Sequence, residues 1–538
     1  MLPRRSAARH VLPVVAALSL LSSSPAPAAT PAAPAPAGGT PLGAAPAPRP
    51  VTPAEARTDA FLQSVRQDPH LAREFFHRMP KGGELHNHLS GAVSPEYLIR
   101  LAAEDGLCID TATLTALAPP CGRGTRPAAD ALTDGEFREA VVRAWSMQDF
   151  PLDGNGHDHF FDTFGKFGEV TWRHRGKLLA EYADVVARQN QSYLETMVSP
   201  ASEEAKELAA EVGLDADPAA LHRKLLRDGK LDAVVARARQ EADDADAEFR
   251  TEARCGTDRP RPGCGVTVRW ISQVSRASAP ERVFTQIALG MRLAERDRRF
   301  VAINLVQPED WETSLRDYRL QMRMIGYLRG VYPRAHVTLH AGELRPGLVK
   351  PADLAFHVKE AVEVARAERI GHGVDLVHED DWQGTVRTMA AREVAVEVPF
   401  TSNAQILGVR GAEHPFETYR AHGVPVVLAT DDPGVSRIDI SHEYRYAADT
   451  YRLAYRDLKD LARASLEYAF LPGASLWRGN PTTGGYRPVD ACRGERPGTP
   501  TRSGECRRMI EESAKARLQW RLETSFAAFE RAHATPSR

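Results

Sequence analysis

Short, strongly apolar runs recur along the chain and alternate with stretches whose apolar residues follow the period of an amphipathic helix. Runs of this length, flanked by polar turns, are typical of buried β-strands. Eight are expected as strands: 84–89, 193–198, 266–271, 300–306, 336–340, 369–371, 394–398 and 424–429. Helical stretches such as 282–298, 314–331 and 354–367 lie between them. Because alternating helices and fully apolar strands imply a parallel sheet, the pattern predicts an α/β protein built on a closed (β/α)8 barrel, the TIM barrel.

The segment between the second and third expected strands is charged rather than apolar. Residues 202–250 have the pattern of two or more helices with solvated charged faces, interrupted near 215–218. We therefore predict a helical insertion at about 200–264, inside a single barrel domain that spans 52–538.

The first residues have the pattern of a targeting segment. Three arginines at positions 4, 5 and 9 precede an apolar run over 11–21, and small residues follow at 26–28. That run is too short to span a bilayer. We predict a signal peptide at 1–28, hence export to the periplasm or the medium, and an Ala/Pro-rich disordered linker at 29–51.

Composition narrows the class of partner. Basic residues number 69 and acidic residues 71, which gives a formal net charge of −2. This balance offers no electrostatic footprint for nucleic acid or an anionic membrane surface. A small uncharged molecule is the expected partner, without stable membrane association, and an oligomer is possible.

The cysteines fall into three pairs of sequence neighbours. We predict three local disulfides, 108–121, 255–264 and 492–506, out of fifteen possible connectivities. Six unrelated buried thiols are the alternative. Zinc is disfavoured because no pair has the spacing of two to four residues that structural zinc sites use. Disulfides agree with export.

Candidate chemistry lies where strands end, which is where barrel enzymes keep it. His86 and His88 stand two positions apart, so on a strand both imidazoles project to one side and can converge on one ion. Alone this pair is a weak signal. Polar motifs at 340–343, 369–373 and 430–433 add further ligands, an acid and a base.

A catalytic zinc ion takes imidazole nitrogens and carboxylate oxygens and keeps one position open for water. Such a set is present in four residues: His86, His88, His340 and Asp431. Glu343 follows His340 closely enough to enter the cavity beside the metal without ligating it. His372 adds a second titratable group near the water.

The chain resembles the adenosine deaminase family of metal-dependent amidohydrolases in five motifs that occur in the same order. These motifs are 79–88, 340–343, 371–373, 399–403 and 430–433. The resemblance runs from about residue 61 to about 529. The targeting segment and the cysteines are similar to those of its secreted, growth-factor-like branch. The resemblance implies one Zn²⁺ per chain and hydrolytic deamination of adenosine or deoxyadenosine to inosine or deoxyinosine and ammonia.

The resemblance also implies roles for single residues. It assigns the zinc ligands to His86, His88, His340 and Asp431. Glu343 is implied as the acid that protonates N1 of the purine, which makes C6 easier to attack. His372, with Asp431, is implied to orient the attacking water and accept its proton. Asp432 is implied to face N7.

One departure concerns the purine edge. After the fourth expected strand the family usually carries a glycine whose backbone amide approaches N3, and here the residue is Gln307. Either its side chain replaces that contact or the pocket favours another 6-aminopurine. The alternatives are thus a deaminase of another 6-aminopurine and a catalytically silent secreted binding or signalling protein on the same fold. The complete set of ligands, acid and base favours an enzyme.

Segment 153–161 contains glycines and histidines that suggest a second metal site. The plainer interpretation is a helix whose phenylalanines at 160, 161, 164 and 167 pack in the core. His157 and His159 receive no role.

Overall fold

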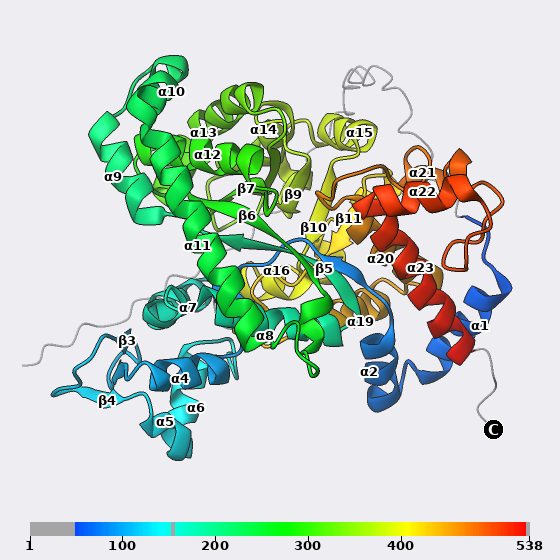
Figure 1. Cartoon of the computed structure of the whole chain (residues 1–538), viewed down its shortest axis with the longest axis horizontal. Helices are drawn as coiled ribbons and strands as arrows, with labels where there is room; N and C mark the ends of the chain where they lie inside the picture. The colour runs from blue at the N-terminus through cyan, green and yellow to red at the C-terminus, as the bar shows by residue number, and fades with distance from the viewer. Residues whose placement is uncertain (1–48, 152–155, 534–538) are drawn as a thin grey trace, which may run out of the picture. The chain divides into compact units, whose positions relative to one another are not determined.

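Eight parallel strands form the centre of the computed structural model, which describes residues 49–151 and 156–533 (Figure 1). The strands neighbour one another in the order β1-β5-β6-β7-β8-β9-β10-β11. Their bounds are β1 Gly82–Glu84, β5 Gln191–Val198, β6 Thr267–Ser275, β7 Phe300–Val306, β8 His336–Ala341, β9 Arg369–His372, β10 Ala395–Val398 and β11 Val426–Leu428. The (β/α)8 barrel is confirmed. Seven of the eight predicted runs coincide largely with a strand or contain one, and the eighth, 84–89, shares only Glu84 with β1.

Helices cover the outside of the barrel, so the strands are buried on both faces and carry continuous apolar runs. The covering helices include α8 Arg175–Arg188, α12 Pro280–Arg296, α13 Glu312–Val331, α14 His357–Glu363, α15 Trp382–Arg392, α16 Phe400–Ile406, α17 Phe416–Ala421 and α19 Ile440–Thr450. α14 is shorter than the predicted 354–367 because its first turn is a separate 3-10 helix and Arg366 takes a left-handed φ of 58°.

The first strand ends five residues earlier than predicted. It stops at Glu84 because that side chain bends back and its Oε1 accepts the backbone N–H of His86 at 3.1 Å. An amide bonded in this way cannot join the ladder to the next strand. His86 and His88 therefore lie on an irregular segment rather than on one face of a regular strand.

The barrel closes through this irregular segment. The backbone N–H of His88 donates to the carbonyl oxygen of Asp431 at 3.1 Å, and the N–H of Asp431 donates to that of His86 at 3.0 Å. Asp431 takes a left-handed φ of 59°. Closure thus brings three predicted metal ligands together through their own backbone.

Three helices occupy the segment between β5 and β6: α9 Ser202–Val212, α10 Pro218–Leu226 and α11 Lys230–Glu252 (Figure 1). Asp217 caps α10 through its side chain, and Pro218 takes the first helical position, which explains the break there. A small antiparallel sheet, which the sequence pattern did not predict, comprises β2 Cys108–Asp110, β3 Ala116–Leu117 and β4 Thr125–Pro127.

All three predicted disulfides are present. They join Cys108 to Cys121, Cys255 to Cys264 and Cys492 to Cys506. The first closes the loop beside the small sheet, the second closes the loop after α11, and the third ties the segment before the C-terminal helices α22 Gly504–Glu512 and α23 Ala514–Ala532.

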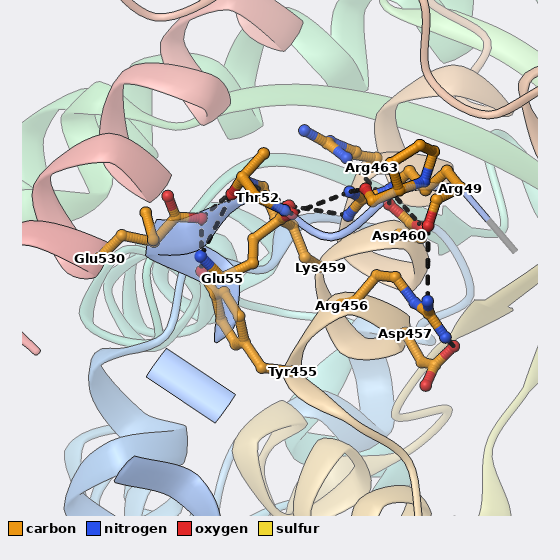
Figure 2. Close-up of polar contacts among 12 residues, drawn as sticks. Arg49, Thr52, Glu55, Tyr455, Arg456, Asp457, Lys459, Asp460, Arg463 and Glu530 are labelled. Atoms are coloured by element: carbon orange, nitrogen blue, oxygen red, sulfur yellow. Dashed lines mark hydrogen bonds and ion pairs between the residues drawn. The ribbon is translucent and has the colours of Figure 1, made fainter. Parts of the chain in front are cut away.

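An ion-pair cluster holds the beginning of the described chain (Figure 2). Arg49 pairs with Glu55 of α1 Pro53–Val65 at 2.8 Å and with Asp460 of α20 Tyr455–Glu467 at 2.9 Å. Lys459 pairs with Glu55 at 3.1 Å and with Glu530 of α23 at 2.6 Å. Residues 49–51, which the linker prediction included, are therefore anchored to the folded unit.

The predicted signal peptide and the rest of the predicted linker lie outside the described residues. Within the described ranges, every helix is too short or too polar to span a bilayer.

Candidate metal centre and active site

The predicted metal-binding and catalytic residues lie at the carboxyl ends of four strands, where TIM barrels carry their active sites. They are placed as follows: His86 and His88 after β1, His340 in β8 with Glu343 just beyond it, His372 as the last residue of β9, and Asp431 and Asp432 after β11. The structure brings all of them together and buries them.

The nitrogen and oxygen atoms of this cluster converge. His88 Nε2 lies 3.2 Å from Asp431 Oδ1 and 3.2 Å from His340 Nε2, and His86 Nε2 lies 3.4 Å from Asp431 Oδ1. Ligand atoms of His86, His340, His372 and Asp431 all lie within 4.8 Å of one another. His88 joins them through Asp431.

Several of these atoms are buried without a hydrogen-bond partner among the described residues: His86 Nε2, His372 Nε2 and Asp431 Oδ1. Burying a polar atom unpaired costs roughly 1–3 kcal/mol, so three at one point indicate that the site takes a further partner. Imidazole nitrogens and a carboxylate oxygen are donors that suit zinc. The residues therefore fit a metal ion.

Each imidazole is oriented by a polar side chain at its second nitrogen, which leaves Nε2 facing the cluster. His86 Nδ1 lies 2.7 Å from Glu397 Oε2, and His340 Nδ1 lies 2.8 Å from Asn304 Oδ1. The remaining contacts are His88 Nδ1 with Gln273 Nε2 at 2.6 Å, His372 Nδ1 with Asn403 Oδ1 at 2.8 Å, and Asp431 Oδ2 with Ser402 Oγ at 2.7 Å.

The sequence analysis missed these orienting residues. Asn304 and Glu397 are the single polar residues of strands β7 and β10, whereas Gln273 is one of several polar residues in β6. A buried polar residue must find a partner, so its presence inside an apolar run was the available signal.

Glu397 is ionised and extends the network away from the cluster. Burial alone would raise the pKa of its carboxyl, but Arg369 and His86 lower that pKa to about 2. Arg369 pairs with Glu397 and, at 2.5 Å, with Glu195 Oε2. A fully buried arginine between two carboxylates thus fixes the group that orients His86.

Glu343 has the environment of a protonated acid. Burial, together with the charges of Asp431 and Glu309, raises the pKa of its carboxyl well above the ordinary value. Its Oε1 lies 3.6 Å from His372 Nδ1. Glu309 holds the backbone here, because its carboxylate accepts the N–H groups of Gly342 and Glu343 at 3.2 and 2.8 Å.

Asp432 lies beside the cluster and is almost fully buried. Burial, followed by the charge of Asp431, raises the pKa of its carboxyl well above the ordinary value. Its Oδ1 has no hydrogen-bond partner among the described residues. A Cβ at Gly91 would lie 1.9 Å from that oxygen, so only glycine leaves Asp432 its place.

The structure does not bring Gln307 into the cluster. The residue is exposed, and its side-chain Oε1 accepts the backbone N–H of Ala277 at 3.0 Å. Its φ of 81° lies in the region that favours glycine. The backbone thus adopts a conformation that favours glycine, the residue that the resemblance implies here, and the contact of the Gln307 side chain with the purine stays a prediction.

The histidines of α7 Gly156–Thr171 make separate contacts rather than a second cluster. His157 Nε2 lies 3.0 Å from Asp310 Oδ1, and His159 Nε2 lies 2.9 Å from the carbonyl oxygen of Ser146. Phe160 and Phe167 are buried, as the core interpretation expected. Residues 152–155 lie outside the described ranges.

A parallel barrel with a His/Asp cluster at its carboxyl edge defines the class: an α/β-barrel protein with a candidate metal centre. A family model described as adenosine deaminase matches residues 155–475, more than half of the chain. The chain belongs to the adenosine deaminase family. The match includes His340, Glu343, His372 and Asp431, and begins after His86.

Curated relatives include the adenosine deaminase of Escherichia coli (strain SE11), 35% identical over 137 residues, which are 25% of this chain and 38% of that protein. The adenosine deaminase of Salmonella heidelberg (strain SL476) is 36% identical over the same shares. The chain therefore matches about two fifths of the length of these relatives.

Solved structures with a similar chain trace include the N6-methyl-AMP deaminase from Arabidopsis thaliana, at 21% identity and a TM-score of 0.49 over 74% of this chain and 94% of that one. The adenine deaminase from Arthrobacter aurescens has 17% identity and a TM-score of 0.44 over 73% and 94%. The predicted likeness to the growth-factor-like branch stays a prediction.

Proposed function

We propose that the protein is a metal-dependent purine deaminase that converts adenosine or deoxyadenosine and water to inosine or deoxyinosine and ammonia. One observation carries the proposal: a buried carboxyl with a raised pKa, Glu343, stands beside convergent His and Asp side chains whose inward atoms lack partners. Membership of the adenosine deaminase family and the names of the curated relatives support the choice of substrate.

The residues that would hold the ion, one Zn²⁺ per chain, are His86, His88, His340 and Asp431. When bound, such an ion lowers the pKa of water toward neutrality, so that hydroxide is available without a strong base. Glu397, Gln273 and Asn304 keep three imidazoles aimed at it.

The other residues handle protons. The Glu343 carboxyl donates its proton to N1 of the purine, which draws electron density from C6 while the water oxygen bonds there. His372 faces the cluster through Nε2, with Nδ1 held by Asn403, so it can take the proton that the water loses. The C6–N bond then breaks, and the amino group leaves as ammonia with that proton. The proton left on the C6 oxygen returns to the Glu343 carboxylate, which gives the 6-oxo product and restores the acid. Protonated Asp432 can donate a hydrogen bond to N7.

We also propose export of the protein. Three disulfides persist only in an oxidising compartment, and they accompany a sequence with the features of a signal peptide.

The test of the proposed reaction follows the adenosine absorbance band with purified protein, with and without a chelator. Adenosine, deoxyadenosine, adenine and AMP form the panel. We expect turnover of adenosine or deoxyadenosine that the chelator abolishes and added zinc restores. Faster turnover of adenine or AMP would favour another aminopurine as the substrate. A protein that deaminates none of the four would be a catalytically inactive protein on the same fold.

A further inference from the structure

A cleft of about 990 Å³ lies between the inserted helices α9 and α11 and the ends of β5 and β6. Its inner wall adjoins the candidate metal centre at His88. Leu89 follows His88 in the chain, Met197 pairs with His88 in an isolated bridge, and the Gln273 amide lies 2.6 Å from His88 Nδ1. The cleft therefore borders the cluster on the side of His88.

Carboxylates outnumber cations on the walls of this cleft. The lining carboxylates are Glu203, Glu204, Glu241, Asp244 and Glu248, and the lining cations are Arg173, Arg175 and Arg237. The cleft thus carries an excess of negative charge, and all five carboxylates lie on the inserted helices α9 and α11.

Each lining arginine already has a carboxylate partner. Arg175 pairs with Glu241 at 3.2 Å, Arg237 pairs with Glu204 at 3.1 Å, and Arg173 pairs with Glu169. An incoming phosphate would have to displace one of these partners. It would also meet the remaining carboxylates in a cleft whose low-dielectric walls focus the field.

We propose that this cleft is an electrostatic filter that admits purine nucleosides with a neutral or cationic 5′ end and rejects those with a 5′ phosphate. The inference rests on the proposed function. The purine must place C6 at the cluster, so the ribose and its 5′ substituent extend toward the opening beside His88. The inserted helices then decide which 5′ groups can enter.

The filter can be tested by binding alone, which separates it from turnover. Calorimetry compares inosine with inosine 5′-monophosphate on the full-length protein in about 0.1 M salt. Wild type should bind inosine at least about tenfold more tightly. In Glu203→Lys/Asp244→Lys, the monophosphate should gain roughly 10- to 100-fold in affinity, because each change removes a negative charge and adds a positive one. Neither residue pairs with a lining arginine, so the walls keep their ion pairs.

The matched control is Glu207→Lys/Glu211→Lys, which makes the same change in charge on exposed positions of α9 outside the cleft. It should leave the preference for inosine within about twofold of wild type, since screening confines charge effects to about 10 Å at 0.1 M salt. In 1 M salt, the increase in affinity of the cleft variant for the monophosphate should shrink toward the value for the control.

Turnover supplies an independent comparison. Wild type should deaminate 5′-amino-5′-deoxyadenosine, which is cationic, at least as efficiently as adenosine. Equal or tighter binding of the monophosphate by wild type would overturn the filter, as would a cleft variant that behaves like the control. Preferential binding of inosine without any deamination would support the filter and contradict only the proposed function. Failure to bind either ligand would overturn both the filter and the proposed function.

Discussion

At the scale of single residues, the neighbours of Glu343 decide whether its carboxyl can act as an acid. Burial and two nearby carboxylates raise the pKa of its carboxyl well above the ordinary value, which favours the protonated form. Glu343→Gln preserves the shape and removes the transferable proton. We expect it to retain the metal and the affinity for inosine while turnover falls roughly 100- to 10,000-fold. Metal analysis, calorimetry and the absorbance assay on one preparation measure all three.

The control for that variant is Glu312→Gln, at an exposed position in the first turn of α13. It should keep full turnover. If Glu343→Gln bound its full share of metal and remained within about threefold of wild-type turnover, Glu343 would not be the proton donor.

His340 tests the metal centre itself. Removing its imidazole takes one ligand from the set, so His340→Ala should lose both metal and turnover. His336→Ala, four residues earlier on the same strand and half exposed, is the comparison and should retain both. Metal content by mass spectrometry decides, and a His340→Ala protein that stayed fully loaded would contradict the assignment.

The sequence predicted the metal-binding and catalytic residues better than the residues that orient them. His86 and Glu343 belong to short motifs, whereas Glu397 and Asn304 are marked only by their place inside an apolar run, and the structure shows which imidazole each one contacts. The contact of Gln307 was equally hidden, because its side chain accepts a hydrogen bond from Ala277, thirty residues earlier in the chain. Contacts between distant segments leave no local pattern.

At the scale of elements, burial on both faces made the strands predictable, because a short continuous apolar run is typical of a strand in the interior of a parallel sheet. The exception was the first strand, where the Glu84 side chain takes the amide of His86 and ends the ladder. The small sheet β2–β4 escaped prediction because its strands have only two or three residues and are tied by the Cys108–Cys121 bond.

The packing of α20 on α23 depends on a buried ion pair. Arg463 donates to both carboxylate oxygens of Glu523, at 2.6 and 2.8 Å, and both side chains are less than 10% exposed. Arg463→Leu should lower the free energy of unfolding by about 3 kcal/mol, because Glu523 stays buried without its partner. Arg463→Leu/Glu523→Leu should recover most of that loss. Thermal or urea melts compare the two, and a double variant no more stable than the single one would contradict this account.

The contact between α16 and α19 predicts a dependence of stability on pH. Burial raises the pKa of Glu443 to about 8 from an ordinary 4.5, although its Oε1 accepts hydrogen bonds from Thr401. Between these values the folded state holds a proton that the unfolded state has released, so this carboxyl lowers stability as pH rises. The penalty is complete above about pH 8.

Glu443→Gln keeps a hydrogen-bond acceptor and cannot ionise. Its stability relative to wild type should therefore increase from pH 5 to pH 9, by about 4 kcal/mol at most. Chemical denaturation at the two pH values measures the difference. Glu417→Gln, an exposed position in α17, should show no such trend, and a constant difference between Glu443→Gln and wild type would refute the shift.

At the scale of the whole molecule, each disulfide constrains a peripheral segment rather than the barrel. The bonded cysteines lie 13, 9 and 14 residues apart, and none belongs to the metal cluster. In the chain-entropy view each bond adds about 3 kcal/mol by constraining the unfolded chain. Reduction of the disulfides should therefore lower the stability of the protein without lowering its catalytic activity.

The last prediction joins those bonds to export. Protein recovered from an oxidising compartment should lack residues 1–28 by intact mass, and unreduced peptide mapping should find the three links. Gentle reduction should lower the melting temperature while metal content and turnover at 25 °C stay near those of the oxidised protein, because the strands and their ligands hold the site without the cysteines. Free thiols at Cys108, Cys255 or Cys492 in that material, or an intact leader, would contradict export with oxidation. Loss of metal on reduction would show instead that the peripheral segments support the barrel.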